Sequence, residues 1–324
     1  MSSRFLNKVG ICNWNDMDKT QLSLKIKAEA KNLGFFACGI AQADAVAQDV
    51  VASYKKWIGE GDHATMAYLE NYPDKRFDPR LLMPGLKSIV SVALNYAPSC
   101  QLPDGEPQFA AYALGKDYHD VVKGKLRQLA DIIGIDEYRA FCDSAPVLER
   151  YWAVKAGLGW TGRNHQLIIP HAGSMFFLGE LFLPVELVYD KELKPHCGKC
   201  HACVDACPTH ALRLDGEQLT SFDARLCLSY QTIENRGDIP SELSKKMGNT
   251  IYGCDRCQAA CPWNRFAEPN HTPELQPSAD LLKMRREDWL ALTEDDYRRL
   301  FKGSAVKRAK YSGLMRNIHE ALGG

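Results

Sequence analysis

Four closely spaced cysteines constrain the fold of this chain more than any other feature of its sequence. Cys197, Cys200, Cys203 and Cys207 are separated by two, two and three residues, and Pro208 follows the last of them. In this spacing three thiolates hold one four-iron iron-sulfur cluster and the fourth thiolate reaches a second cluster. The run therefore predicts a turn-rich module that binds two clusters and moves electrons.

A second, incomplete cysteine run lies farther along the chain. Cys254, Cys257 and Cys261 repeat the last three members of the pattern, but Ile251 stands where a complete run has its first cysteine. Cys227 lies between the two runs and can supply the missing ligand. We predict Cys197, Cys200, Cys203 and Cys261 as ligands of one cluster, and Cys207, Cys227, Cys254 and Cys257 as ligands of the other.

Structural zinc is the alternative for eight cysteines, because two sets of four thiolates can each bind zinc tetrahedrally. Zinc sites do not usually show an interleaved run that is closed by proline, so the iron-sulfur interpretation is favoured. The remaining cysteines, at positions 12, 38, 100 and 142, lack any such spacing. We expect them to pack as small apolar side chains.

Length and composition indicate an ordinary globular protein with more than one part. The chain has 324 residues, 45% of them hydrophobic and 25% charged, and its 40 Lys and Arg residues equal its 40 Asp and Glu residues. The overall charge therefore points to no nucleic-acid or membrane partner. The sequence shows no secretory signal and no apolar run long enough to span a bilayer, so we expect a cytoplasmic protein that binds no membrane.

Apolar periodicity predicts an α+β fold in three parts. Residues 1–190 read as an α/β domain, residues 191–265 as a ferredoxin-like module, and residues 266–324 as a basic helical tail. Within the first part we predict helices at 22–33, 46–58, 64–69, 118–133 and 147–156, strands at 35–41, 88–96 and 138–142, and extended segments at 165–170 and 174–182.

Two short motifs match known ligand-binding patterns, but the residues around them do not fit those patterns. Gly157, Gly159 and Gly162 match the dinucleotide-binding glycine pattern, but here a predicted helix precedes the glycines and an extended segment follows them, which reverses the required order. We expect these glycines to end a helix and turn the chain. Asp117-x-His119 resembles the start of a cobalt-ligating histidine motif, but Val122 replaces its glycine, so we treat the match as chance.

Several longer motifs together resemble those of the epoxyqueuosine reductases. The resemblance runs from about residue 20 to the end of the chain, in the same cysteine order. It implies an enzyme that uses cobalamin and two four-iron clusters to reduce epoxyqueuosine in the wobble position of tRNA to queuosine. The motifs that carry it are YALGKDYH at 112–119, DSAPVLER at 143–150, GLGWTGRN at 157–164, GS at 173–174 with LGE at 178–180, CLSY at 227–230 and KGSAVKR at 302–308.

Asp143 is the catalytic residue that this resemblance favours. Removing an epoxide oxygen as water requires a nearby proton donor, and Asp143 lies between a predicted strand and a predicted helix. We expect partial burial beside a large cofactor to raise its pKa and keep it protonated. The residues alone favour a capping or turn role, because Asp-Ser-x-Pro is common in turns.

The resemblance also suggests residues that line the corrin or the modified base: Met66, Arg76, Tyr96, Asn164 and Ser229, besides Asp143. Each of them also fits an ordinary core or turn position. For tRNA, the segment from 298 to 316 carries seven basic residues and no acidic one, which suits contacts with phosphates or a solvated helix face. We predict Lys302, Lys307, Arg308 and Lys310 as contacts.

Two other functions remain open from the sequence. Reductive dehalogenases also combine cobalamin with two clusters, but the missing export signal and the basic tail oppose that class. A two-cluster electron-transfer protein would contain no cobalt.

We expect a monomer that receives electrons from a low-potential donor such as flavodoxin or ferredoxin. Many relatives continue into helical repeats after the point where this chain stops, so it is expected to be a short or truncated member.

Overall fold

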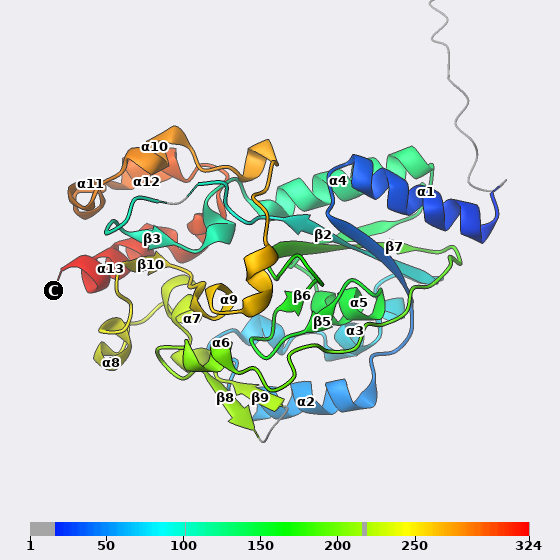
Figure 1. Cartoon of the computed structure of the whole chain (residues 1–324), viewed down its shortest axis with the longest axis horizontal. Coiled ribbons are helices and arrows are strands. Elements are labelled where there is room, and N and C mark those ends of the chain that lie inside the picture. Colours follow the sequence, from blue (N-terminus) through cyan, green and yellow to red (C-terminus); the bar gives the residue numbers. More distant parts are fainter. Residues whose placement is uncertain (1–16, 101, 216–218, 324) are drawn as a thin grey trace, which may run out of the picture.

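A four-stranded antiparallel sheet organises the first half of the chain (Figure 1). The computed structural model describes residues 17–100, 102–215 and 219–323. The strand order is β1 (Ala37–Gln42), β2 (Ser88–Asn95), β7 (Phe176–Leu183) and β4 (Arg139–Phe141), with Val92 opposite both Cys38 and Gly179. The three predicted strands and the second extended segment are thereby confirmed, and the pairing makes the fold mixed helix and sheet.

Helices cover both faces of this sheet, which explains the nearly continuous apolar sequence of β2. On one face lie α1 (Lys19–Asn32) and α4 (Tyr118–Ile133), whose Ile26, Leu126 and Leu129 are completely buried. On the other face α5 (Glu149–Lys155) packs through Trp152 and Ala153, and the same core takes Val51 from α2 (Gln48–Gly59).

Both long helices of the first half were predicted from apolar periodicity, and the structure adds the residues that cap them. Asp18 accepts hydrogen bonds from the backbone of Thr20 and Gln21 at the start of α1, in a capping box. Asp117 caps α4 in the same way, and Gly134 ends that helix with a φ of 80°. The predicted helix at 64–69 is wrong in extent, because only the 3₁₀ turn η2 (Ala67–Leu69) forms there.

The glycine-rich segment after α5 turns the chain as predicted. Gly157, with a φ of 74°, follows the helix. A Cβ atom on Gly159 would lie 2.0 Å from the backbone oxygen of Ile168, so the two backbones approach too closely for a side chain. The hairpin β5 (Trp160–Thr161) and β6 (Leu167–Ile168) follows. A helix therefore precedes the glycines, which excludes the dinucleotide motif.

The cysteine-bearing segment is built from short helices and turns. The helices α6 and α9, which carry Cys203 and Cys257, pack against each other. This short-element architecture suits a module that wraps bound groups rather than one built around a large apolar core. Its elements are α6 (Ala202–Asp205), β8 (Leu212–Asp215), β9 (Leu219–Phe222), η5 (Ala224–Leu226), α7 (Leu228–Ile233), α8 (Ser241–Ser244), β10 (Thr250–Tyr252), α9 (Arg256–Ala259) and η6 (Pro262–Phe266).

The C-terminal helices share a core with two earlier segments. β10 pairs with β3 (Gln108–Phe109), and Phe109, Ile251 and Tyr252 pack with Trp289 and the last helix. Ile251 is completely buried there. The remaining elements are α3 (Pro73–Phe77), η3 (Pro79–Leu81), η4 (Ala111–Ala113), η7 (Pro273–Leu275), α10 (Ala279–Lys283), α11 (Arg286–Leu290), α12 (Glu294–Leu300), η8 (Ala305–Ala309) and α13 (Lys310–Leu322).

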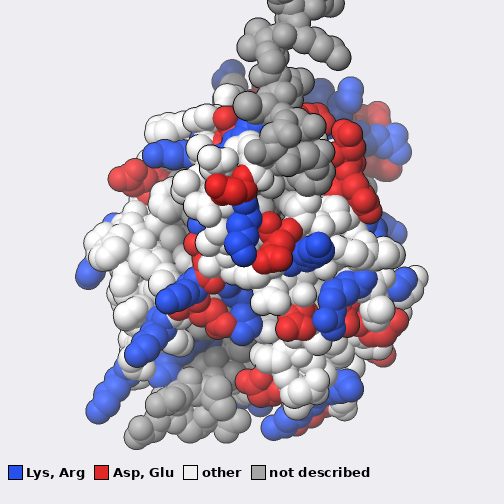
Figure 2. Space-filling model, turned by 90° about the vertical axis from the view of Figure 1, so that its right-hand side faces the viewer, with Lys and Arg blue, Asp and Glu red and all other residues white. Residues whose placement is uncertain are grey.

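Surface charge is mixed rather than gathered. Figure 2 shows one face on which basic and acidic side chains lie side by side, in keeping with the 40 basic and 40 acidic residues of the sequence. Among the helices of the described residues, none is both long and apolar enough to cross a bilayer.

Gly39 provides a test of the packing between β1 and α5. A Cβ atom there would lie 2.0 Å from the backbone oxygen of Ala156 and 2.7 Å from Leu158 Cδ1, so Gly39→Ala must push the helix away from the sheet. We expect a loss of about 1–3 kcal/mol in the free energy of unfolding, measured by urea denaturation. Gly124→Ala in α4, where the new Cβ meets no atom within 4 Å, is the control and should stabilise by about 0.5–1 kcal/mol. Equal stability of the two variants would contradict this packing.

Candidate functional site

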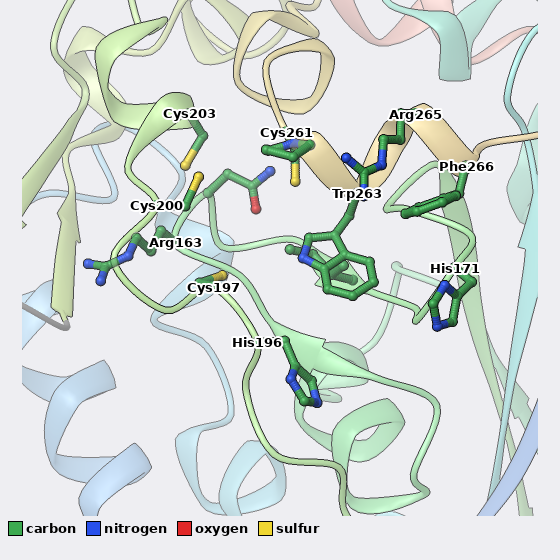
Figure 3. A pocket seen from close by; sticks show the side chains of 13 residues that line it. Arg163, His171, His196, Cys197, Cys200, Cys203, Cys261, Trp263, Arg265 and Phe266 are labelled. Atoms are coloured by element: carbon green, nitrogen blue, oxygen red, sulfur yellow. The ribbon is translucent and has the colours of Figure 1, made fainter.

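Four of the eight cysteines surround one cavity. A space of about 310 Å³ is lined by Cys197, Cys200, Cys203 and Cys261. Figure 3 shows the first three near Cys261, which follows the C-terminal end of α9. Burial raises the pKa of the Cys203 thiol to about 11, and the charges of the other three cysteines add to the rise. The structure thus brings together the four residues that the spacing assigned to one cluster.

The other four cysteines form a second group beside the first. Burial raises the pKa of the Cys227 thiol to about 11, with further contributions from the charges of Cys254 and Cys207. Burial also raises the pKa of Cys257, and the charges of Cys227, Cys254, Cys203 and Cys207 act in the same direction. Because Cys203 belongs to the first group, the two groups meet where Cys203 and Cys257 face each other.

Both groups suit a cluster better than a single ion. Within the described part of the chain, no three His, Cys, Asp or Glu side chains converge closely enough to hold one metal ion. The thiols of the first group instead line a cavity, and the charges of neighbouring cysteines raise the pKa of Cys203 and of Cys257, so these two need a positively charged group nearby to become thiolates. Ile251 lies in β10 within the apolar core, which explains why its position supplies no ligand.

One loop of the sheet domain touches both cysteine groups. The Nδ2 of Asn164 donates to the backbone oxygen of Cys257 at 3.4 Å, and Arg163 Nη2 donates to the backbone oxygen of Gly198 at 2.8 Å. Tyr96 is buried nearby, and its hydroxyl and Gln258 Nε2 lie 3.0 Å apart. The predicted residues Asn164 and Tyr96 therefore lie against the cysteine module.

Aromatic side chains fill the outer part of the first cavity. Trp263 contacts Trp160 and His171 through its ring, at centroid distances of 5.0 and 5.8 Å, and Phe266 and His196 complete the group (Figure 3). The lining includes arginines and histidines but no aspartate or glutamate. Cys200 is exposed at this side, so the first group lies close to the protein surface.

Asp143 lies in the loop between β4 and α5, beside the N-terminal turn of α4. Its φ is 57°, a left-handed conformation that non-glycine residues adopt rarely. The hydroxyl of Tyr118 donates to Asp143 Oδ2, and His119 Nε2 lies 3.5 Å from the same oxygen. The side chain of Asp143 keeps 61% of its surface accessible, so its carboxyl can meet a bound molecule.

The expected direction of the Asp143 pKa is wrong for this structure. Burial acts to raise that pKa, but the hydrogen bonds from His119 and Tyr118 and the charges of His119 and Arg150 outweigh it and lower the pKa. The proton lies on His119 instead, because hydrogen bonds to Asp117, at 2.6 Å, and to Asp143 raise the pKa of the imidazole to about 9. At neutral pH the pair is an imidazolium beside a carboxylate.

Parts of all three predicted regions surround this pair. Tyr68 in η2 is 46% exposed, and the guanidinium of Arg308 lies 5.5 Å from the centre of its ring. Burial raises the pKa of Tyr68 to about 12, with the charges of Glu234 and Asp143 adding to the rise. Glu234 and Arg308 form a two-pronged ion pair with both distances at 2.8 Å. Asp143 and Tyr68 thus lie near the junction of the sheet domain, the cysteine module and the C-terminal helices.

Of the other residues predicted to line the corrin, two are half-buried and one is buried. Met66 precedes η2 and is half-buried. Arg76 is buried beneath η2, where its Nη2 donates to the backbone oxygens of Tyr68 and Asn71 at 3.3 Å. Ser229 is half-buried in α7, whose Tyr230 hydroxyl lies 2.7 Å from Thr65 Oγ1.

Some basic residues between 298 and 316 already have partners among the described residues, and others do not. Arg298 and Arg299 pair with acidic residues of α12 and α10, and Arg316 donates to backbone oxygens around Gln231. Arg308 is held by Glu234. Lys302, Lys307 and Lys310 are exposed and form no ion pair within the described residues. Three of the four predicted tRNA contacts therefore remain available for phosphates.

Sequence reasoning missed four residues around Asp143: Tyr118, His119, Glu149 and Glu180. Two signals were present. The Asp117-x-His119 pair was set aside as a chance match to a cobalt motif, although it caps α4 and orients the imidazole. Glu180 interrupts an otherwise apolar strand, where an acid needs a specific partner.

Comparison with known proteins places these features in one family. The family model described as "4Fe-4S double cluster binding domain" matches residues 196–264, and the model "Epoxyqueuosine reductase QueG, DUF1730" matches residues 76–144. An epoxyqueuosine reductase of Cellulophaga algicola is 46% identical over 297 residues, which cover 90% of this chain and 95% of that protein.

Solved structures agree with the sequence matches. A crystal structure of an epoxyqueuosine reductase with an epoxyqueuosine-modified tRNA-Tyr stem loop is 29% identical, with a TM-score of 0.82, over 93% of this chain and 81% of that one. The Bacillus subtilis epoxyqueuosine reductase, in a structure whose aspartate catalytic loop is swung out of the active site, gives 29% identity, a TM-score of 0.83 and the same coverages.

The raised pKa of His119 gives a direct titration experiment. We expect its ring signals in an NMR titration to stay in the protonated position through neutral pH and to move near pH 9. Asp117→Asn replaces the carboxylate that accepts from the imidazole and should lower this pKa, whereas Asp120→Asn, on the neighbouring exposed residue of α4, should not. Since the folded pKa exceeds the ordinary 6.5, the stability from these contacts is complete below about pH 6.5 and is lost as the pH rises through 9. An ordinary pKa for His119 would contradict the described geometry.

Proposed function

The chain belongs to the epoxyqueuosine reductase family, and we propose on this basis that it reduces epoxyqueuosine in tRNA to queuosine. The observation that carries the proposal is the placement of Asp143, with its imidazolium partner His119, in the same molecule as two groups of four cysteines. A plain electron carrier has no use for such an acid-base pair. The resemblance to family members extends over 90% of the chain, so it includes both features.

The enzyme uses two four-iron clusters and cobalamin. The first cluster would be bound by Cys197, Cys200, Cys203 and Cys261, and the second by Cys207, Cys227, Cys254 and Cys257, because those sets act on one another electrostatically. The exposed ring of Tyr68, next to Met66, offers an apolar surface for a large flat group. The buried Nε of Arg76 has no acceptor within the described residues, and the amide groups around a corrin ring carry such acceptors. The residues present therefore fit cobalamin.

The reaction requires two electrons and two protons for each epoxide oxygen that leaves as water. Cobalamin supplies a strongly nucleophilic reduced metal when bound, and iron-sulfur clusters deliver electrons singly. Asp143 would hand a proton to the departing oxygen through Oδ2, and His119 Nε2, 3.5 Å away, would replace it. A large group that covers Asp143 removes its contact with water and raises its pKa, which favours the protonated carboxyl before transfer.

The tRNA would lie across the junction beside Arg308. The exposed Lys302, Lys307 and Lys310 would contact phosphates, and Arg308 would contribute from its place between Glu234 and Tyr68. A tRNA substrate suits a protein that acts in the cytoplasm, and we propose that it acts there as a monomer. Ser229 and Asn164 would line the base or the corrin from the side of the cysteine module.

Each of the three parts of the chain would have its own function. Residues 1–190 would bind cobalamin, residues 191–265 would bind the two clusters, and residues 266–324 would form the basic helical part. Electrons would enter at the first cluster, because Cys200 is exposed and the adjoining cavity carries Arg265, His171 and His196 without any acidic residue. Such a rim suits an acidic low-potential donor such as flavodoxin or ferredoxin.

Replacing Cys227 tests the assignment of ligands. In Cys227→Ala the second group loses one of its four thiolates while the first group stays complete, so the iron content after anaerobic reconstitution should fall from about eight to about four atoms per chain. Cys100→Ala, which changes a cysteine outside both groups, should keep the full content. Unchanged iron content in Cys227→Ala, or the same loss of iron in Cys100→Ala, would show that the cysteines are assigned to the clusters incorrectly.

Replacing Asp143 tests the function. Asp143→Asn keeps the shape of the side chain but cannot donate a carboxyl proton, so we expect queuosine formation to slow by about 10²–10⁴-fold. Iron content, cobalamin content and tRNA affinity should not change. Nucleoside analysis by mass spectrometry gives the rate, and Asp136→Asn, an exposed position of the same domain, is the control. A normal rate for Asp143→Asn in fully loaded protein would exclude the proposed role.

A further inference from the structure

Two glutamates lie behind Asp143, Glu180 buried and Glu149 half-buried, and the proposed mechanism does not use them. Glu180 stands in the middle of β7, opposite Ser91 of β2 and Phe141 of β4, and has no exposed surface. Glu149 is the first residue of α5, only a few residues after Asp143. The side chains of the two glutamates hydrogen-bond to each other. An acid in the centre of a sheet is costly unless its charge is removed or matched.

The contact between the two carboxyl groups requires a proton. Ser91 Oγ lies 3.4 Å from Glu180 Oε1, whereas Glu180 Oε2 finds no ordinary donor within the described residues. Two carboxylates cannot hydrogen-bond, but a carboxylic acid can donate to a carboxylate. Burial raises the pKa of both glutamates. Glu149 raises the pKa of Glu180 further, through its charge and its hydrogen bond, whereas the hydrogen bond with Glu180 lowers the pKa of Glu149, so the proton belongs to Glu180. One proton is therefore held between them.

Other ionisable groups around the pair do not neutralise it. Asp143 acts on Glu149 with a negative charge, and Arg150 acts with a positive charge from the exposed side of α5. Cys142 is buried beside both glutamates, and Lys123 of α4 is the basic group that acts on this cysteine. Lys123 Nζ is itself bonded to Ser144 Oγ at 2.6 Å.

Glu149 also holds the backbone of the catalytic loop. Its Oε1 accepts a hydrogen bond from the backbone N–H of Asp143. Asp143 has a φ of 57°, a conformation that costs free energy in a residue with a side chain and persists only when its surroundings fix it. The bond from Glu149 is such a restraint, and it reaches across the loop from the start of the next helix.

We propose that Glu149 and Glu180 act as a latch that positions Asp143: Glu180 donates its proton to Glu149, and Glu149 fixes the backbone N–H of Asp143. With the latch closed, the Asp143 carboxyl stays at Tyr118 and His119. Loss of the shared proton places two negative charges together in the sheet, close to the charge of Asp143, and releases the loop. The role is one of positioning, and its catalytic consequence rests on the proposed function.

Hydrogen exchange of the protein without substrate tests the latch apart from catalysis. Glu149→Ala removes the acceptor, so exchange in the peptide that contains residues 142–148 should become about ten- to hundredfold faster, the range for a lost hydrogen bond to a charged group. Glu192→Ala is the matched control, because this glutamate pairs with Lys155 at the other end of α5 and does not reach Asp143. Unchanged exchange in Glu149→Ala, or equal acceleration in both variants, would overturn the latch.

If Glu149→Ala fails to fold, Glu180→Gln provides a second test of the latch. A glutamine donates to Glu149 at every pH, so its loop should stay protected at alkaline pH, where the wild-type loop loses protection after correction for the intrinsic exchange rate. An identical pH dependence in Glu180→Gln and wild type would show that the pair holds no controlling proton.

Kinetics then separate positioning from binding. In loaded enzyme Glu149→Ala should lower kcat by about ten- to hundredfold with little change in the KM for tRNA, because the latch acts on Asp143 and not on the tRNA surface. A change confined to KM would contradict the latch. If wild-type protein forms no queuosine, the proposed function fails, while the exchange experiment still decides whether the latch exists.

Discussion

The crowding of eight thiols in one short segment is the constraint on which the rest of the structure depends. In each group burial and the charges of neighbouring cysteines raise the pKa of a member, Cys203 in the first group and Cys257 in the second, so these two stay as thiols without a bound cationic group. Bound clusters would remove this conflict and would hold α6 and α9 together. Asn164 and Arg163 of the sheet domain contact the backbone of the same module, at Cys257 and at Gly198.

A second conflict of charges lies at Asp143. Its exposed carboxyl contacts an imidazolium and a tyrosine hydroxyl, which control its charge, and its backbone N–H donates to Glu149, which controls its position. In the proposed function the two sites would have complementary tasks, since the cysteine module would supply electrons and Asp143 would supply a proton.

The sequence was informative wherever spacing or periodicity is local. The cysteine order predicted both groups and the substitution at Ile251, and helices α1 and α4 were predicted from their apolar periodicity, which is local; the structure shows that Asp18, Asp117 and Gly134 cap their ends. The contact between Glu149 and Glu180 was not accessible, because it depends on how β7 lies beneath α5. The pKa of Asp143 was misjudged for the same reason: burial was foreseen, but His119 was not known to be adjacent.

The most direct test of the central claim is the reaction itself. Protein purified without oxygen, with its iron, sulfide and cobalamin contents measured, is given a low-potential reductant and tRNA that carries epoxyqueuosine, and the nucleosides are quantified by mass spectrometry. The account predicts that queuosine appears as epoxyqueuosine disappears, in equal amounts, and only when clusters and cobalamin are both present. Fully loaded protein that leaves epoxyqueuosine unchanged would contradict it.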